Sequence, residues 1–270
     1  MSLTRIQRLA YVLRKMRLLQ LADLCWFLRL YLSSRKANNR FRNKHPNVPV
    51  PPQTMLYDIQ GNCDLSGFYT SGQEHAHEIS RIIAAERPGR TLNILEWGCG
   101  PARVLQHLNS PNGSIWELWG SDYNPKSISW CQQNWPGIHF VHNGLEPPIP
   151  VKTEFFDVIY CISVFTHLSE VRHYQWITEI CRLLKPGGLF IGTFHGNAFR
   201  DNLTNDEQRR FDSGELVIRD KIREGKKDFS AYHCDIFVSR ILAPFEIVKR
   251  LDTVAGFRQT VWTAIKKGND

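Results

Sequence analysis

The residues best suited to do chemistry lie in the segment NILEWGCGPARVL, residues 93–105. An apolar run that predicts a strand ends in Glu96, and two glycines, Gly98 and Gly100, follow at once. Glycine has no Cβ, so the backbone can turn tightly there and approach a ligand closely. A helix is predicted directly after the turn, at residues 102–109. A strand, a glycine turn and a helix in this order are typical of a nucleotide-type cofactor site.

A second acidic residue supports the same interpretation. The next apolar stretch ends in Asp122, about 20 residues beyond the glycine turn. A carboxylate at the end of that strand can accept hydrogen bonds from two ribose hydroxyls. Tyr123 follows it, in a position from which its ring can lie against an adenine. The two signals together are more specific than a glycine turn alone, which a tight strand-to-helix connection also produces.

At these residues the chain resembles the class I S-adenosylmethionine-dependent methyltransferases, whose first motif reads acidic-x-Gly-x-Gly-x-Gly. Here the motif is Glu-Trp-Gly-Cys-Gly-Pro-Ala, so Ala102 replaces the third glycine. The resemblance implies S-adenosyl-L-methionine as the cofactor. It also implies an α/β, Rossmann-like fold with a mostly parallel, seven-stranded sheet that an antiparallel hairpin closes. Glu96 argues against a dinucleotide, because a carboxylate suits a zwitterionic amino acid better than a phosphate.

The rest of the chain fits this architecture. From Leu92 onward, strand and helix patterns alternate, which predicts a parallel sheet with helices on both faces. We expect strands at residues 92–97, 117–122, 138–142, 156–162, 188–194, 245–251 and 260–266. We expect helices at residues 73–86, 102–109, 125–134, 169–184 and 235–243. A charged insertion at about 196–230 is expected to be mostly a solvated helical face, and its position after the fifth strand makes it a candidate substrate lid.

The resemblance extends the cofactor site to the ends of the third and fourth strands. Asn143 ends the third strand, where similar enzymes often carry an aspartate that contacts the adenine amino group, and Gly144 leaves room beside it. The alternative for this Asn-Gly pair is a simple turn. Cys161 and Ser163 end the fourth strand, where their carbonyl groups are expected next to the sulphonium. Cys99, inside the glycine turn, completes the predicted cofactor-binding set.

Two histidines, His167 and His195, are the predicted catalytic residues, because they follow the fourth and fifth strands at the edge where open α/β sheets bind ligands. Methyl transfer is an in-line displacement, which needs a base only when the acceptor is a hydroxyl or a protonated amine. A histidine suits that task near neutral pH. The alternative for both is a structural or substrate-positioning role. His75, His77 and His173 fall on predicted helices and are expected to be solvated, and no spacing indicates a metal site.

The acceptor is constrained mainly by exclusion. The chain has neither an (Asn/Asp/Ser)-Pro-Pro-(Tyr/Phe) tetrad nor a Pro-Cys loop, which disfavours methylation of nucleic-acid bases. The body of the chain has no strong basic patch, so nucleic acid is an unfavoured partner. The segments SVFTHLSE and KPGG resemble bacterial methyltransferases of small molecules or sugars. We therefore expect O-methylation of a small-molecule or glycan acceptor, including a lipid-linked one. The alternatives are methylation of RNA or protein and a non-catalytic assembly role.

The basic charge is concentrated at the N-terminus. Residues 1–44 hold 11 Lys or Arg and one acidic residue, Asp23, which leaves 23 basic and 25 acidic residues for the rest of the chain. Apolar residues at helical spacing predict an amphipathic helix at residues 3–35, and polar and proline-rich residues 36–53 predict a linker before a domain at residues 54–270. The arm is expected to pack on the domain or on a second subunit, to lie on an anionic membrane surface, or to bind RNA.

Composition also bounds the compartment. The most apolar part of the arm, residues 18–32, is too short and too charged to span a bilayer, and no signal-peptide cleavage site follows it. The seven cysteines include no C-x-x-C pair, which is typical of free thiols in a reducing cytosol. We expect a cytoplasmic protein, either free or peripheral to the inner face of the membrane through residues 1–35.

Overall fold

The protein is described by a computed structural model over residues 19–88, 91–111, 113–219, 224–225, 229–252 and 254–268. The chain divides into two compact units, Met1–Phe68 and Tyr69–Asp270. The division falls within α4 (Leu65–Glu86), later than the boundary that the sequence suggests after residue 53. The reason is that the residues just before and at the start of α4 hold contacts with α2 (Leu19–Lys44).

The first unit contains α2, α3 (Gln53–Gln60) and the start of α4. Asn38 joins them: its buried side-chain amide donates to the carbonyl of Cys63 at 2.7 Å and to Oε1 of Gln53 on α3 at 3.2 Å, and it accepts from the backbone N–H of Leu65 at 3.1 Å. Part of the predicted helix, residues 3–18, lies outside the described residues. The helix continues to Lys44, so the linker prediction is wrong for residues 36–44.

Helix α2 ends at Lys44, shortly before Pro46. Pro46 disfavours helical backbone in the residue before it, and only residues 45–52, which are rich in proline, form an irregular connection. Within the described part of the chain, no helix combines the length and the apolar character needed to cross a membrane.

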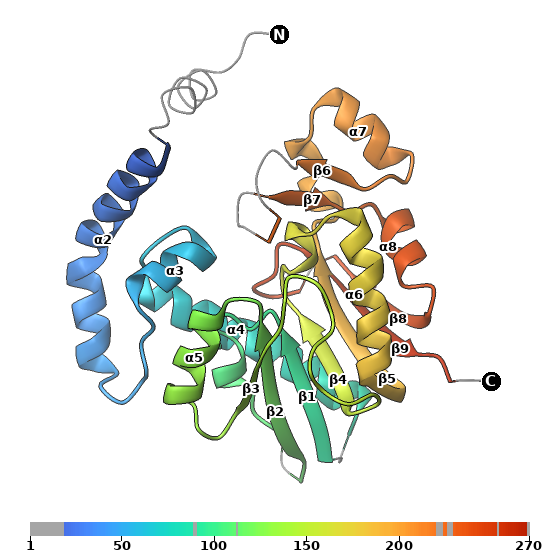
Figure 1. The fold of residues 1–270 in the computed structure, drawn as a ribbon, viewed down its shortest axis with the longest axis horizontal. Coiled ribbons are helices and arrows are strands. Elements are labelled where there is room, and N and C mark those ends of the chain that lie inside the picture. Colours follow the sequence, from blue (N-terminus) through green and yellow to red (C-terminus); the bar gives the residue numbers. More distant parts are fainter. Residues whose placement is uncertain are drawn as a thin grey trace. The chain divides into compact units, whose positions relative to one another are not determined.

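The second unit is built on a seven-stranded sheet in the order β3-β2-β1-β4-β5-β9-β8 (Figure 1). The strands are β1 (Thr91–Trp97), β2 (Ile115–Asp122), β3 (His139–His142), β4 (Phe156–Cys161), β5 (Leu184–Phe194), β8 (Phe245–Leu251) and β9 (Thr260–Lys266). The first five pair in parallel, and β9 runs antiparallel to both β5 and β8. The predicted α/β class, with a parallel sheet closed by an antiparallel hairpin, is confirmed.

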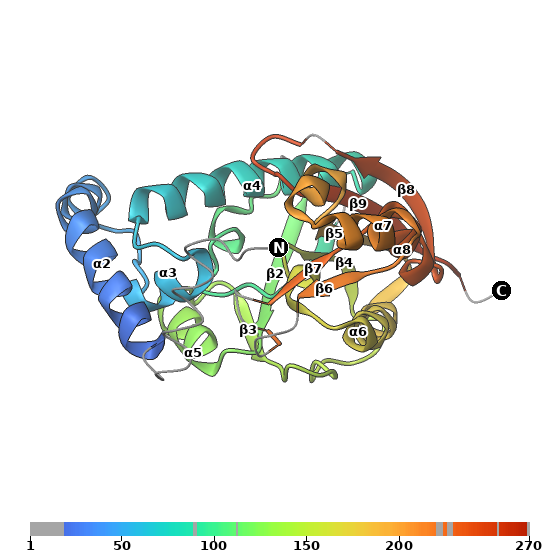
Figure 2. The same cartoon turned by 90° about the horizontal axis from the view of Figure 1, so that it is seen from above.

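Helices cover both faces of this sheet because side chains alternate along each strand. Ile94 and Tyr160 belong to one hydrophobic cluster, which includes residues of α4 and of α5 (Pro125–Asn134). Leu95 and Ile159 belong to the other cluster, which includes residues of α6 (Glu170–Leu183) and α8 (Asp235–Ile241). Figure 2 shows α6 and the later part of α4 on opposite sides of the sheet. Strand order reverses at β1, whose neighbours are β2 and β4, and ligands bind at such a point, beyond the carboxyl ends of the strands.

The insertion after β5 contains η3 (Asn197–Asn202), α7 (Asn205–Asp212), β6 (Val217–Arg219) and β7 (Ser230–Tyr232), and the two strands pair antiparallel. The predicted solvated helical face is only part of this segment. Five of its apolar side chains are buried in the cluster that contains α6: Leu203, Phe211, Leu216, Val217 and Phe229. These apolar residues anchor the insertion to the hydrophobic core of the second unit.

Candidate cofactor and active site

The glycine turn after β1 requires its glycines. Gly98 and Gly100 have φ values of +79° and +52°, in the left-handed region that glycine enters without steric cost. The backbone N–H groups of Gly98 and Cys99 both donate to the carbonyl of Ser121, at 2.7 and 3.0 Å, which ties the turn to the end of β2. A Cβ on Gly98 would overlap Cγ2 of Val164. The turn is thus held between β2 and the segment after β4.

The helix predicted at residues 102–109 is not present. Residues 101–104 form turns, and only η1 (Leu105–His107), a short 3-10 helix, follows. Ala102 has a φ of +56°, which is incompatible with a right-handed helix, and the backbone N–H of Leu105 donates to the carboxylate of Glu96 at 3.0 Å. The carboxylate of Glu96 therefore accepts the Leu105 N–H, which in a regular helix would donate to a backbone carbonyl of the same helix.

Glu96 is buried beneath the turn. Besides the N–H of Leu105, its carboxylate accepts the hydroxyl of Tyr160 at 3.1 Å. Burial raises the pKa of Glu96 to about 8, and the positive charge of Arg103 opposes that rise. The Arg103 guanidinium in turn donates to Nδ1 of His75 at 2.9 Å. Glu96 thus stabilises the fold of the turn, and its contact with the cofactor stays a prediction.

The solvation predicted for three histidines is borne out for one of them. His77 is exposed, whereas His75 is half-buried and joins Arg103 to the carbonyl of Gly256 at 2.7 Å. His173 is fully buried, and its Nε2 lies 2.8 Å from Nε2 of the equally buried His233. Burial lowers the pKa of His173 to about 4, so this pair is neutral and structural.

Asp122 connects the two halves of the predicted cofactor site. One carboxylate oxygen accepts the N–H of Gly100 at 2.9 Å and the other accepts the N–H of Asn124 at 2.7 Å. Burial raises its pKa, and these two hydrogen bonds oppose the rise. Each carboxylate oxygen has a second lone pair, so both can still accept a ligand hydroxyl. The adjacent Tyr123 is exposed, and its hydroxyl donates to the carbonyl of Gly225 at 2.6 Å.

Asn143 carries an unused buried acceptor. Its side chain is 4% exposed, and its backbone N–H donates to the carbonyl of Asp122 at 3.1 Å. Its amide nitrogen donates to the carbonyl of Gly144 at 2.6 Å, while its Oδ1 has no hydrogen-bond partner among the described residues. A buried acceptor without a donor costs about 1–3 kcal/mol, so a ligand amine is a suitable partner for it. A Cβ on Gly144 would lie 2.9 Å from the carbonyl of Glu146, so this glycine serves the turn itself.

The end of β4 is fixed by residues far along the chain. Cys161 is buried and pairs with Gly192 on β5. Ser163 has a φ of +60°; its N–H donates to Oγ1 of Thr193 at 2.8 Å, and its hydroxyl donates to Oε1 of Gln259 at 3.0 Å. Its carbonyl accepts the hydroxyl of Thr166 at 2.7 Å. No local sequence pattern marks Thr193 and Gln259 as part of this site, because only the β5–β9 pairing brings them together.

The two predicted catalytic histidines are oriented by one segment. Nδ1 of His167 lies 2.8 Å from the carbonyl of Phe229, and Nδ1 of His195 lies 3.0 Å from the carbonyl of Ala231. A carbonyl only accepts, so Nδ1 carries a proton in both rings, and Nε2 of a neutral His195 is an acceptor. Burial lowers the pKa of His195 to about 4, and the nearby His167 and Arg258 lower it further. His195 is therefore a neutral ring at physiological pH.

Comparisons with known proteins point to methyltransferases. Residues 95–192 match the family model described as a methyltransferase domain. An uncharacterized methyltransferase of Synechocystis is 25% identical over 126 residues, which is 47% of this chain and 57% of that protein. A ubiquinone biosynthesis O-methyltransferase of Maricaulis maris is 27% identical over 110 residues, which is 40% of this chain and 42% of that protein. The matches span about half the length of these curated relatives.

Solved structures share the fold. A methyltransferase from Methanosarcina mazei superposes with a TM-score of 0.51 at 19% identity, covering 69% of this chain and 97% of that one. The amino pentose methyltransferase from Micromonospora echinaspora gives a TM-score of 0.55 at 14% identity, covering 75% and 96%. The strand order, the antiparallel β9 and the site at the order reversal define a class I methyltransferase fold. Residues 95–192 therefore match a methyltransferase domain, and the second unit has the class I methyltransferase fold that the sequence predicted.

Proposed function

We propose that the protein transfers a methyl group from S-adenosyl-L-methionine to a hydroxyl of a small-molecule or glycan acceptor. The observation that carries this proposal is His195, a neutral ring at the carboxyl end of β5 whose Nδ1 is fixed by Ala231 and whose Nε2 has no hydrogen-bond partner among the described residues. A hydroxyl acceptor has a proton to lose, and a positioned neutral imidazole is a suitable base for it.

The residues near β2 and β3 fit the cofactor. Asp122 would accept the ribose hydroxyls, Oδ1 of Asn143 would accept the adenine amine, and the turn at Gly98 and Gly100 would allow the close approach of the backbone. The bound cofactor supplies a methyl group on a sulphonium, which is already an excellent leaving group. The protein's own contribution is to align the acceptor, exclude water and hold a proton acceptor.

His195 would take the acceptor's proton at Nε2 as the oxygen attacks. Ala231 keeps Nδ1 protonated, so the incoming proton has one place to go. The low pKa of His195 means that the resulting imidazolium releases its proton to water readily, which restores the neutral ring. The ubiquinone biosynthesis O-methyltransferase named among the relatives supports a hydroxyl acceptor.

A labelled-cofactor assay on cell extract tests this proposal with the His195→Gln variant. We expect its rate of labelling to fall at least about 100-fold, the usual contribution of a general base, while its affinity for S-adenosylhomocysteine stays within about threefold. The pKa of His195 is about 4, so His195 stays neutral between pH 6 and 8. Its protonation should therefore not slow the wild-type enzyme in that range. His77→Gln, which changes an exposed histidine, is the matched control. Unchanged labelling by His195→Gln would contradict the assigned role.

We also propose that the first unit docks on an anionic membrane surface. One face of α2 packs inside the unit through Asn38 and Phe41, which are buried. A second stripe of apolar side chains at helical spacing is exposed: Leu24, Leu28, Tyr31 and Leu32. Basic side chains accompany this stripe: Arg29, Arg35 and Lys36. Asp23, the one acidic residue of the helix, accepts a hydrogen bond from Tyr57. An apolar stripe with basic flanks is complementary to anionic lipid headgroups over acyl chains.

A further inference from the structure

Two aromatic rings contact His195 in a tilted geometry. Its ring centroid lies 4.2 Å from that of Phe199 on η3 and 5.3 Å from that of Tyr232 on β7. An arginine guanidinium lies over each of these two rings. Arg258 is 5.5 Å from the Phe199 centroid, and Arg219 is 5.2 Å from the Tyr232 centroid. The proposed base is therefore linked through one aromatic ring to each of two cations.

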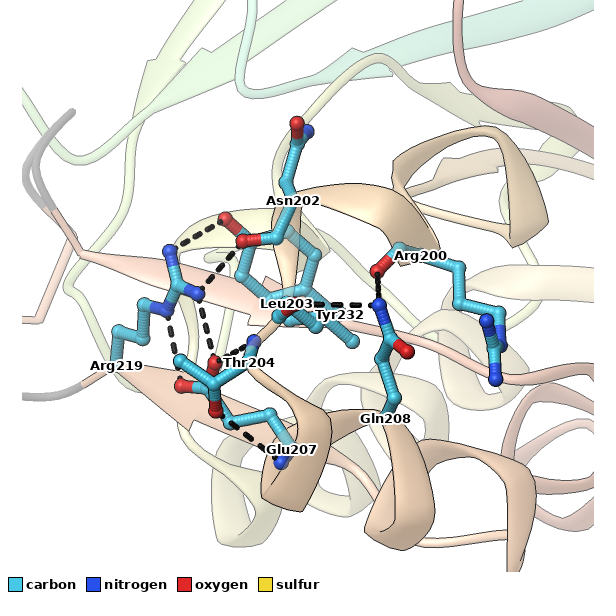
Figure 3. Close-up of polar contacts among 8 residues, drawn as sticks. All are labelled: Arg200, Asn202, Leu203, Thr204, Glu207, Gln208, Arg219 and Tyr232. Carbon is cyan, nitrogen blue, oxygen red and sulfur yellow. Dashed lines mark hydrogen bonds and ion pairs between the residues drawn. The ribbon is translucent and has the colours of Figure 1, made fainter. Parts of the chain in front are cut away.

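One of these two cations is fully engaged by the protein. Arg219 donates to both carboxylate oxygens of Glu207, at 3.0 and 2.7 Å, and to the carbonyl of Asn202 at 2.9 Å (Figure 3). Glu207 also closes the capping box of α7 with Thr204. Arg219 holds the pKa of Glu207 at about 2, so the pair is ionised across the physiological range. Arg219 thus fixes Tyr232 beside His195 and has its charge neutralised by a carboxylate.

The other cation has no such partner. The side chain of Arg258 is exposed and makes no ion pair or hydrogen bond with any described residue. Its position is nevertheless defined, because its neighbour Gln259 accepts hydrogen bonds from Thr193 and Ser163 at the ends of β5 and β4. The arginine lies at the edge of the site, and its charge reaches His195, whose pKa it helps to lower.

We propose that Arg258 binds an anionic group of the methyl acceptor, a carboxylate or a phosphate, and so presents the acceptor's hydroxyl to His195. This inference rests on the proposed function. The contact distances, 5.5 Å from Arg258 to Phe199 and 4.2 Å from Phe199 to His195, put cation and base within the length of one small molecule. The Phe199 ring between them offers an apolar surface for the part of the acceptor that joins its anion to its hydroxyl.

The arrangement also couples binding to reactivity. Arg258 without a counter-ion disfavours the protonated form of His195. An acceptor anion on Arg258 neutralises that charge, which raises the proton affinity of His195 when the acceptor is in place. The base is therefore strongest in the complex that needs it, and a neutral acceptor would gain neither the ion pair nor this effect.

The test compares Arg258→Gln with Arg258→Lys and with a matched control, Arg240→Gln, which changes an exposed arginine on α8. Each protein is incubated with methyl-labelled S-adenosylmethionine and dilute cell extract, and the small-molecule products are separated by anion exchange. We expect the wild-type label in a retained, anionic product. Labelling should fall at least about 10-fold in Arg258→Gln, recover in part in Arg258→Lys and match the wild type in the control, with unchanged affinity for S-adenosylhomocysteine.

Phosphatase treatment of the labelled product distinguishes the two anions, because it releases the label from the column only if the group is a phosphate monoester. Label in an unretained, neutral product, or wild-type labelling by Arg258→Gln, overturns the role of Arg258 and leaves the proposed methyl transfer standing. If the wild type binds S-adenosylhomocysteine and labels nothing, both proposals fall.

Discussion

Replacing Asp122 by alanine gives the most direct test of the cofactor site. Its two carboxylate oxygens each accept one backbone N–H, from Gly100 and Asn124, and each keeps a lone pair for a ribose hydroxyl. A hydrogen bond to a charged acceptor contributes about 1.5–3 kcal/mol, so two of them amount to about 3–6 kcal/mol. At about 1.4 kcal/mol for each factor of ten, Asp122→Ala should weaken S-adenosylhomocysteine binding by about 10²–10⁴-fold.

Isothermal titration measures this loss, and a second carboxylate supplies the control. Asp157 also accepts a backbone N–H, from Asn93 at 2.9 Å, and pairs with Lys185 at 2.8 Å, but it lies at the opposite end of the strands. Asp157→Ala should lower the melting temperature, because it removes these contacts. It should leave S-adenosylhomocysteine affinity within about threefold, because Asp157 is far from the predicted cofactor site. If Asp122→Ala binds within threefold of the wild type while folded, the site is wrongly assigned.

Three further changes probe separate parts of the molecule. Gly98→Ala should lower the free energy of unfolding by about 2–4 kcal/mol, because its φ of +79° suits glycine and its Cβ would overlap Val164; urea denaturation measures this, and a change under 0.5 kcal/mol would contradict it. Asn143→Ala should weaken S-adenosylhomocysteine binding about 10-fold with little change in melting temperature, because it removes an unpaired buried acceptor together with the one hydrogen bond to Gly144, and these two effects on stability oppose each other; equal affinity would refute the adenine contact. The double variant Leu28→Asp, Leu32→Asp should abolish co-sedimentation with phosphatidylglycerol vesicles, with phosphatidylcholine vesicles as the control, whereas loss of a dimer instead would point to a second copy of the chain.

Several elements were predictable because their signals are local. Helix α5 begins and ends at the predicted residues, since Asn124 caps it and Pro125 occupies its first turn. Strands β8 and β9 also fall where predicted, and the turn at Gly256 has the φ of +78° that glycine permits. In contrast, the helix expected after the glycine turn does not form. The backbone N–H of Leu105 donates to the buried carboxylate of Glu96, on the preceding strand, and local sequence patterns do not reveal that partner.

Burial was the property that local patterns predicted least well. His173 has the polarity of a surface residue on an amphipathic helix, yet it is fully buried, because His233 from a distant segment supplies a hydrogen-bond partner in the core. The insertion after β5 was similarly underestimated, since its charged composition conceals the few apolar residues that anchor it.

The class of fold was readable from the amino-acid sequence, because the glycine turn, the acidic residue after the next strand and the alternation of elements are all short-range features. The same features predict where the cofactor binds. Which side chains meet at that edge of the sheet depends on long-range packing. The carbonyls of Phe229 and Ala231 orient two histidines, and Arg258, next to the anchored Gln259, lies over the Phe199 ring that contacts His195. These partners lie far along the chain and are joined by strand pairing, so no local spacing encodes their contact.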